Sequence, residues 1–302
     1  MSKYNSGLQK RCGCDLMKKY FEHSRMILGI IFFIFIIMLS ATCLAATVET
    51  EYIKIPAQID GKIYNLDAKI YKPEGDGPFP LIVLTHGRHG HVSDGRIRTP
   101  DDYAMTAMAF EKMNCVVVYV VRRGYGKSDG PDAESFSGDY VDVYRIGSQG
   151  AKDIKGVVEY MKTKPYIDSS KIVLAGHSTG GAVVMAANCL GIPGVQGIIN
   201  FSGGLGSRNT IGMLNAFERF GKEGKVPTLW FYARNDTFFD YPLQQQIYKK
   251  YSENGGRATF IEMEPSGTEG HNIIYEAIPQ WLSYARDYLK AIGFNVSEAS
   301  SE

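Results

Sequence analysis

One short stretch of the sequence restricts the possible fold more than any other, the segment Gly176-His177-Ser178-Thr179-Gly180-Gly181. It directly follows Ile172-Val173-Leu174-Ala175, an apolar run typical of a buried strand. A G-x-S-x-G sequence between a strand and a helix forms a tight turn that holds the serine in a strained backbone conformation and exposes its hydroxyl. The segment therefore predicts a nucleophile, Ser178, at the carboxyl end of a parallel strand.

The chain around this segment alternates short β-rich runs with helical stretches, which predicts an α/β fold whose mostly parallel sheet is covered by helices on both faces. Two runs that flank the turn Asp60-Gly61, namely Glu51–Ile55 and Ile63–Tyr71, predict an antiparallel hairpin that opens the sheet. Six more strands are expected at Leu81–Thr85, Cys115–Val121, Lys171–Ala175, Gly197–Phe201, Thr228–Ala233 and Ala258–Met263. Helices are expected at about 101–113, 148–162, 179–190, 211–221, 241–254 and 272–291. The gap between Phe201 and Thr228 leaves no room for a large lid domain, so we expect an open substrate groove.

A serine hydroxyl becomes a good nucleophile only when a base removes its proton and an acid orients that base. In this architecture the three residues follow one another in the order Ser, acid, His. His271 is the only histidine after Ser178 and lies in a predicted loop. Asp236 comes just after the predicted strand Thr228–Ala233, which places its carboxylate on the same rim of the sheet. Asp240 is the alternative acid, although its position before a helix favours a capping role.

Acyl transfer also requires backbone N–H groups that stabilise the oxyanion. One is expected from Thr179, the residue after the nucleophile, and one from the loop that follows the strand Leu81–Thr85. In that loop Gly87 permits a close approach of the backbone to the acyl group, and the Arg88 N–H is the predicted second donor. The side chains of His86 and His89 are expected to be structural.

The ordered set of motifs HG, RRGYGKSDG, GHSTGG, RND and GHN, between residues 50 and 292, resembles the α/β-hydrolase superfamily. It is most similar to single-domain dienelactone-hydrolase-like and prolyl-oligopeptidase-like serine hydrolases. The resemblance implies an eight-stranded, mainly parallel sheet and hydrolysis through an acyl-enzyme. Dienelactone hydrolases proper have a cysteine at the position of Ser178, and prolyl oligopeptidases carry a β-propeller for which this chain has no room. Ester hydrolysis is therefore favoured over peptide hydrolysis.

The expected function is that of a serine hydrolase acting on a small-molecule ester or short peptide, with a peptidase or amidase as the alternative. A non-catalytic binding protein on the same fold is the alternative from a different class. No cofactor or metal is expected, since the five cysteines form no zinc-binding pattern. The net charge of +1 gives no sign of a nucleic-acid partner. The oligomeric state cannot be predicted.

Seven arginines lie on predicted rim loops or near them. A cluster of arginines at the rim would favour anionic substrates by electrostatic focusing. The competing expectation is that they are solvated or pair locally with Asp94, Asp101 or Asp129. The arginines concerned are Arg88, Arg96, Arg98, Arg122, Arg123, Arg208 and Arg234.

The N-terminal segment has the character of a targeting signal. Met26–Leu39 is apolar without interruption, basic residues precede it, and small residues follow it up to Ala45 and Ala46. Because a signal-peptide core needs about 7–15 apolar residues and a spanning helix about 20, residues 1–45 are predicted to be a cleaved signal peptide. Translation is expected to start at Met17. Residues 46–302 would then form an exported catalytic domain, periplasmic or secreted; the alternative is an uncleaved membrane anchor over residues 26–46, the only predicted membrane contact.

Overall fold

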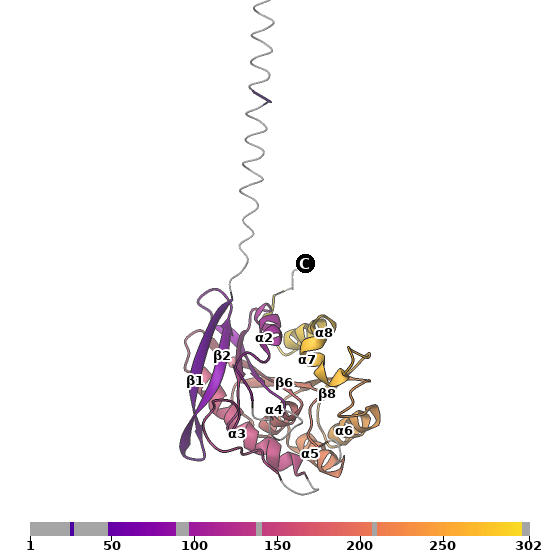
Figure 1. The fold of residues 1–302 in the computed structure, drawn as a ribbon. Coiled ribbons are helices and arrows are strands. Elements are labelled where there is room, and N and C mark those ends of the chain that lie inside the picture. The colour runs from indigo at the N-terminus through magenta and orange to yellow at the C-terminus, as the bar shows by residue number, and fades with distance from the viewer. Residues whose placement is uncertain (1–24, 27–47, 89–96, 137–140, 207–209, 298–302) are drawn as a thin grey trace, which may run out of the picture. The chain divides into compact units, whose positions relative to one another are not determined.

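The alternation of apolar strands and helices produces a single eight-stranded sheet (Figure 1). This computed structural model describes residues 25–26, 48–88, 97–136, 141–206 and 210–297. Across the sheet the strands are β1 (Glu49–Ile59), β2 (Lys62–Lys72), β4 (Val116–Val120), β3 (Phe79–Thr85), β5 (Ile167–His177), β6 (Val195–Phe201), β7 (Thr228–Ala233) and β8 (Ala258–Met263). Strands β3 to β8 are parallel to one another, while β2 is antiparallel to both β1 and β4. The predicted fold class is confirmed.

The hairpin β1–β2 opens the sheet as predicted. Its turn residues Asp60 and Gly61 both have positive φ, +49° and +80°. Two consecutive left-handed residues are what a two-residue hairpin turn of type I′ requires. The register therefore pairs Ile59 with Lys62 directly across the turn.

Seven helices and one 3-10 turn connect the strands in the described part of the chain. They are α2 (Ala104–Glu111), α3 (Val143–Met161), α4 (Thr179–Cys189), α5 (Thr210–Glu223), α6 (Tyr241–Glu253), η1 (Gly270–Asn272), α7 (Ile273–Glu276) and α8 (Ile278–Ala291). The single C-terminal helix expected at 272–291 is thus divided into three pieces. The division at Ala277 precedes Pro279, whose ring favours the first turn of a helix and disfavours a helix interior.

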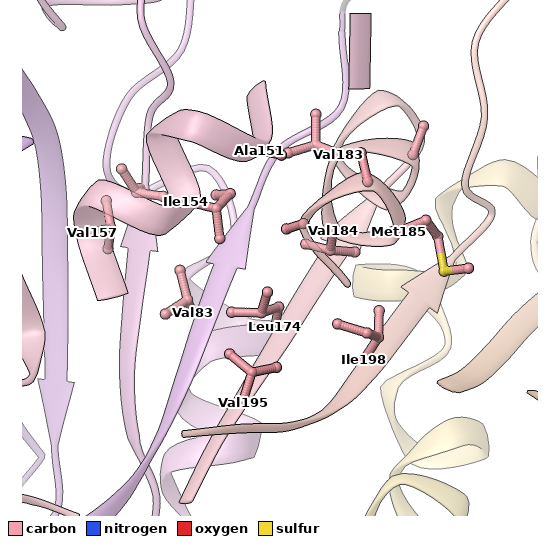
Figure 2. Close-up of a cluster of buried hydrophobic side chains, with 14 of the residues drawn as sticks. Val83, Ala151, Ile154, Val157, Leu174, Val183, Val184, Met185, Val195 and Ile198 are labelled. Carbon is pink, nitrogen blue, oxygen red and sulfur yellow. The ribbon is translucent and has the colours of Figure 1, made fainter. Parts of the chain in front are cut away.

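The two faces of the sheet bury separate apolar clusters. One cluster packs α3, α4, α5 and α6 against one face, and Figure 2 shows its centre, where side chains of α3 and α4 meet those of β3, β5 and β6. The other cluster packs α2, α7 and α8 against the opposite face. Trp230 lies fully buried in the first cluster and Trp281 in the second. Removal of these apolar side chains from water is the main source of stability for the layered arrangement.

The loops that follow β3, β5, β7 and β8 lie at the carboxyl edge of the parallel sheet, where ligands bind in open α/β sheets. Between β6 and β7 the described chain contains only helix α5 and its connections, so the expected absence of a large lid holds for that connection.

The N-terminal predictions fall almost entirely outside the described residues. Among the residues that are described, no helix is long and apolar enough to cross a membrane. The signal peptide, its cleavage and the alternative anchor remain predictions.

Candidate active site

Ser178 lies in a tight turn at the carboxyl edge of the sheet. Ser178 has φ +54° and ψ −122° and stands between the last residue of β5, His177, and the first residue of α4, Thr179. A non-glycine residue at positive φ is strained, and such strain persists only where the surroundings impose it. Here the Ser178 N–H donates to the carbonyl of Phe201 at 3.0 Å, and the Ser178 carbonyl accepts from the N–H of Gly204 at 2.9 Å. The predicted strand–turn–helix geometry of the motif is present.

Two loops remote in sequence bring the imidazole of His271 to a carboxylate. Asp236 Oδ2 lies 2.9 Å from His271 Nδ1, and both residues are buried. The second oxygen of Asp236 accepts the backbone N–H groups of Phe238 and Phe239 at 2.8 and 2.9 Å. The carboxylate is therefore held at both oxygens, and it fixes the proton of His271 on Nδ1 and leaves Nε2 to act as a base.

Asp240, the alternative acid, caps a helix instead. Its side chain accepts the N–H of Leu243 at 3.0 Å and caps helix α6. No contact joins Asp240 to His271 in the described structure, so Asp236 is the residue whose geometry suits an acid of the triad.

Aromatic rings shield the imidazole of His271. Phe238 stacks on it at a centroid distance of 4.5 Å, and the buried Phe239 meets it edge-on at 5.3 Å. Phe238 itself is 46% exposed. An exposed aromatic ring beside the base provides an apolar surface at the rim of the site.

The residue that precedes the serine contacts the backbone of His271. His177 Nε2 lies 2.7 Å from the carbonyl oxygen of His271. Within the described residues the Ser178 hydroxyl itself makes no hydrogen bond to the imidazole. In enzymes without bound substrate, catalytic hydrogen bonds are often long and tighten only in the substrate complex.

Gly87 passes directly over the serine. A β-carbon added to Gly87 would lie 2.8 Å from the β-carbon of Ser178, a distance that side chains do not adopt, so only glycine fits here. The next residue, Arg88, makes no backbone hydrogen bond through its N–H in the described structure, and neither does Thr179 at the start of α4. Two N–H groups that donate to no described residue, one beside Ser178 in sequence and one in the loop above it, suit the stabilisation of an oxyanion.

A sequence model of the alpha/beta hydrolase family matches residues 82–288, more than half of the chain. The chain belongs to the alpha/beta hydrolase family. The resemblance deduced from the ordered motifs is thereby confirmed.

Solved structures share the fold of this hydrolase at low sequence identity. An esterase from Pyrococcus furiosus is 16% identical, with a TM-score of 0.58 over 82% of this chain and 92% of its own. A putative dienelactone hydrolase from Klebsiella pneumoniae is 13% identical, with a TM-score of 0.52 over 78% and 99%. A putative dipeptidyl aminopeptidase IV from Bacteroides ovatus is 17% identical, with a TM-score of 0.60 over 82% of this chain but only 36% of its own.

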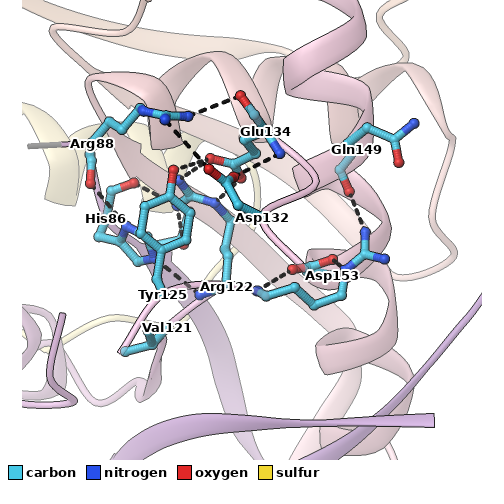
Figure 3. Close-up of polar contacts among 12 residues, drawn as sticks. His86, Arg88, Val121, Arg122, Tyr125, Asp132, Glu134, Gln149 and Asp153 are labelled. Carbon is cyan, nitrogen blue, oxygen red and sulfur yellow. Dashed lines mark hydrogen bonds and ion pairs between the residues drawn. The ribbon is translucent and has the colours of Figure 1, made fainter. Parts of the chain in front are cut away.

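A buried ion pair between Arg122 and Glu134 lies near His86 and Arg88, the residues on either side of Gly87 (Figure 3). Arg122 is fully buried and binds Glu134 through two hydrogen bonds, one of them 2.9 Å from Nη2 to Oε2. Its third nitrogen donates to the hydroxyl of Thr85 at 2.8 Å and to the carbonyl of His86. The ion pair thus joins the carboxyl ends of β3 and β4 beside the loop that contains Gly87. This pairing has no signal in the sequence, because eleven residues without helix or strand separate the partners.

His86 is structural, as predicted. Its ring is buried, and its Nε2 accepts the N–H of Arg122 at 3.0 Å. The proton must therefore sit on Nδ1, which donates to the carbonyl of Gly87 at 2.9 Å. His89 lies outside the described residues.

The rim arginines are compensated by carboxylates, but not by those expected. The pairs are Arg88–Asp132, Arg98–Asp102, Arg122–Glu134, Arg123–Asp153 and Arg234–Glu262. Asp101 instead pairs with Lys69, and Asp129 accepts hydrogen bonds from Asn65, so for these five described arginines the expected pairing with these two aspartates is wrong. Asp94, Arg96 and Arg208 lie outside the described residues. With these five arginines paired, a site for anionic substrates loses its main support.

Proposed function

We propose that this hydrolase cleaves carboxylic esters through a triad of Ser178, His271 and Asp236. The observation that carries the proposal is the pair of contacts at Asp236: one carboxylate oxygen holds His271 Nδ1, and the other is held by two backbone N–H groups. An imidazole fixed in this tautomer presents Nε2 as the base for a serine hydroxyl on the same rim.

In the proposed reaction, the Ser178 oxygen attacks the ester carbonyl while His271 Nε2 takes the hydroxyl proton. The carbonyl oxygen becomes negatively charged, and the N–H groups of Arg88 and Thr179 stabilise it. The imidazolium then gives its proton to the leaving alcohol, and the C–O bond breaks to leave an acyl-enzyme. A water molecule repeats the sequence and releases the acid. Asp236 stays ionised throughout and stabilises the imidazolium.

Ester rather than amide cleavage is proposed because the fold matches that of an esterase over 82% of this chain and 92% of the esterase. The similar aminopeptidase is almost three times as long as the matched region, so its likeness concerns only part of that protein. The apolar ring of Phe238 beside His271 favours an ester with an apolar acid or alcohol part.

The test is a comparison of Ser178→Ala with a matched control, Ser202→Ala. Ser202 follows β6, also has positive φ, and buries a hydroxyl without a hydrogen-bond partner in the described residues. We expect Ser178→Ala to lower turnover of a short p-nitrophenyl ester by about 10⁴-fold or more, and Ser202→Ala to change it little. A fluorophosphonate probe should label the unmodified protein at Ser178.

Three outcomes distinguish the alternatives. Ester turnover that survives in Ser178→Ala would overturn the triad. Faster cleavage of an aminoacyl anilide than of the matching ester would favour a peptidase or amidase. An unmodified protein that neither hydrolyses esters nor reacts with the probe would point to a binding protein.

A further inference from the structure

The residue before the proposed nucleophile is a buried histidine that the triad does not use. His177 is 5% exposed, and both of its ring nitrogens have partners. Nε2 lies 2.7 Å from the His271 carbonyl oxygen, and Nδ1 lies 2.9 Å from the Tyr103 hydroxyl. A carbonyl oxygen can only accept, so the ring proton sits on Nε2, and Nδ1 accepts the proton of the Tyr103 hydroxyl.

The chain of hydrogen bonds continues beyond Tyr103. The hydroxyl oxygen of this tyrosine accepts the backbone N–H of Gly87 at 3.3 Å. Each proton therefore has one place. The Gly87 N–H donates to the Tyr103 hydroxyl, the Tyr103 hydroxyl donates to His177 Nδ1, and His177 Nε2 donates to the His271 carbonyl. The chain begins at the oxyanion loop and ends at the backbone of the proposed base.

Burial keeps the members of this chain neutral. Burial and the neighbouring His271 hold the pKa of His177 well below its usual value of 6.5. Burial also raises the pKa of Tyr103 above its usual value of 10.0. A neutral histidine and a neutral tyrosine preserve the donor and acceptor roles at neutral pH.

We propose that Tyr103 and His177 are positioning residues. They hold Gly87, which precedes the proposed oxyanion donor Arg88, and His271, the proposed base, in fixed places relative to Ser178. The proposal rests on the proposed function. Neither side chain touches the reacting atoms, and both act through backbone groups: Tyr103 through Gly87 and His177 through His271. Because the oxyanion donors and the base act most strongly in the transition state, loss of the chain should lower kcat and leave KM nearly unchanged.

Tyr103→Phe tests the proposal with little change in packing, and the chain offers a matched control. Tyr119 is fully buried, its ring lies 5.2 Å from that of Tyr103, and its hydroxyl has no hydrogen-bond partner in the described residues. We expect Tyr103→Phe to lower kcat for a p-nitrophenyl ester by about 10- to 100-fold with KM within about two-fold. Tyr119→Phe should leave both constants unchanged.

His177 provides a second, independent pair of variants. A glutamine amide has the length to donate to the His271 carbonyl as Nε2 does, whereas alanine removes both contacts. We expect kcat to fall in the order unmodified protein, His177→Gln, His177→Ala. Circular dichroism spectra and melting midpoints identify any variant that fails to fold, and conclusions are drawn from the others.

The result that would overturn the proposal is a kcat for Tyr103→Phe equal to that of Tyr119→Phe, or His177→Ala as active as His177→Gln. These outcomes differ from failure of the proposed function. If the proposed function fails, the unmodified protein shows no ester turnover that depends on Ser178, and the hydrogen bonds of Tyr103 and His177 have no triad to position.

Discussion

At the scale of single residues, the peptide bond between Gly87 and Arg88 is held from its carbonyl side. The Gly87 carbonyl accepts one hydrogen bond from Arg98 Nη2 at 2.8 Å and another from His86 Nδ1 at 2.9 Å. In a trans peptide the N–H points away from the carbonyl. Two donors on the oxygen therefore fix the direction of the Arg88 N–H, the proposed oxyanion donor.

Replacement of Arg98 by methionine should loosen that donor. The variant keeps the aliphatic part of the side chain and removes the cation from the Gly87 carbonyl. Loss of a whole oxyanion donor costs about 10²- to 10³-fold in kcat, so a misdirected donor should cost about 10-fold, with KM little changed. Steady-state kinetics with a p-nitrophenyl ester measure the effect. Arg234→Met, which removes an exposed rim arginine paired with Glu262, is the control. Equal kcat values for the two variants would contradict the prediction.

The residues of the proposed triad could be named from the sequence because each obeys a local rule. Ser178 lies in a motif between a strand and a helix, His271 is the only later histidine, and Asp236 follows a strand. Tyr103, Arg98 and the role of His177 were not predictable. Their contacts join loops that are remote in sequence, and hydrogen bonds between loops leave no periodic or local pattern. The catalytic roles themselves remain predictions.

At the scale of elements, the predicted strands and helices occur at the expected places; apart from the division of the C-terminal helix, the differences lie at their ends. Helix α3 begins at Val143 rather than near 148, because Asp142 caps it by accepting the N–H of Arg145 at 2.9 Å. Gly147 and Gly150 weaken the helical pattern in the sequence, but they allow α4 to approach closely. A β-carbon on Gly150 would lie 2.5 Å from Val183. Tertiary packing thus outweighs local helix propensity in this segment.

The link between β3, β4 and the following loop depends on the ion pair of Arg122 and Glu134. Glu134→Gln removes the negative charge and leaves a fully buried guanidinium group without its partner. Such a change costs about 3–5 kcal/mol of unfolding free energy. Urea unfolding followed by circular dichroism measures it. Glu262→Gln, at the more exposed pair with Arg234, should leave the unfolding midpoint unchanged. A Glu134→Gln midpoint equal to that of this control would show that the buried pair contributes little.

At the scale of the whole molecule, the buried His177 makes stability depend on pH. Burial is the largest cause that lowers its native pKa, followed by His271 and Arg98; the rings of Tyr103 and Tyr275 also face it. As the pH falls through about 6.5, the unfolded chain binds a proton at this residue and the native protein does not. Stability should therefore fall, by up to about 1.4 kcal/mol per pH unit from this group.

The measurement is the unfolding free energy between about pH 7.5 and 5.5, for the unmodified protein and for His177→Gln. Contributions from other groups are common to both proteins, so the difference isolates His177. We expect a flatter profile for the variant. Parallel profiles would mean that His177 binds its proton over the same pH range in the native protein as in the unfolded chain, which would contradict the prediction.

The predicted cleavage site after Ala45 lies before the first described residue of the folded unit. The described unit begins at Val48, which packs against the cluster of α2, α7 and α8, and β1 begins at Glu49. Cleavage after Ala45 would therefore leave every described residue of this unit in place. We expect a chain that starts at Ala46 to keep the melting midpoint and ester turnover of the full chain, and N-terminal sequencing of exported protein to begin at residue 46 or 47. Exported protein that retains residues 26–46 would indicate the anchor.

The two tryptophans of the chain, Trp230 and Trp281, lie in different clusters on opposite faces of the sheet. Each face therefore carries its own intrinsic fluorophore, shielded from water in the native state. In Trp281→Phe the remaining emission reports on the layer of α3 to α6, and in Trp230→Phe it reports on the layer of α2, α7 and α8. The two optical signals make it possible to ask whether both helical layers come away from the sheet together or one after the other, without any added label.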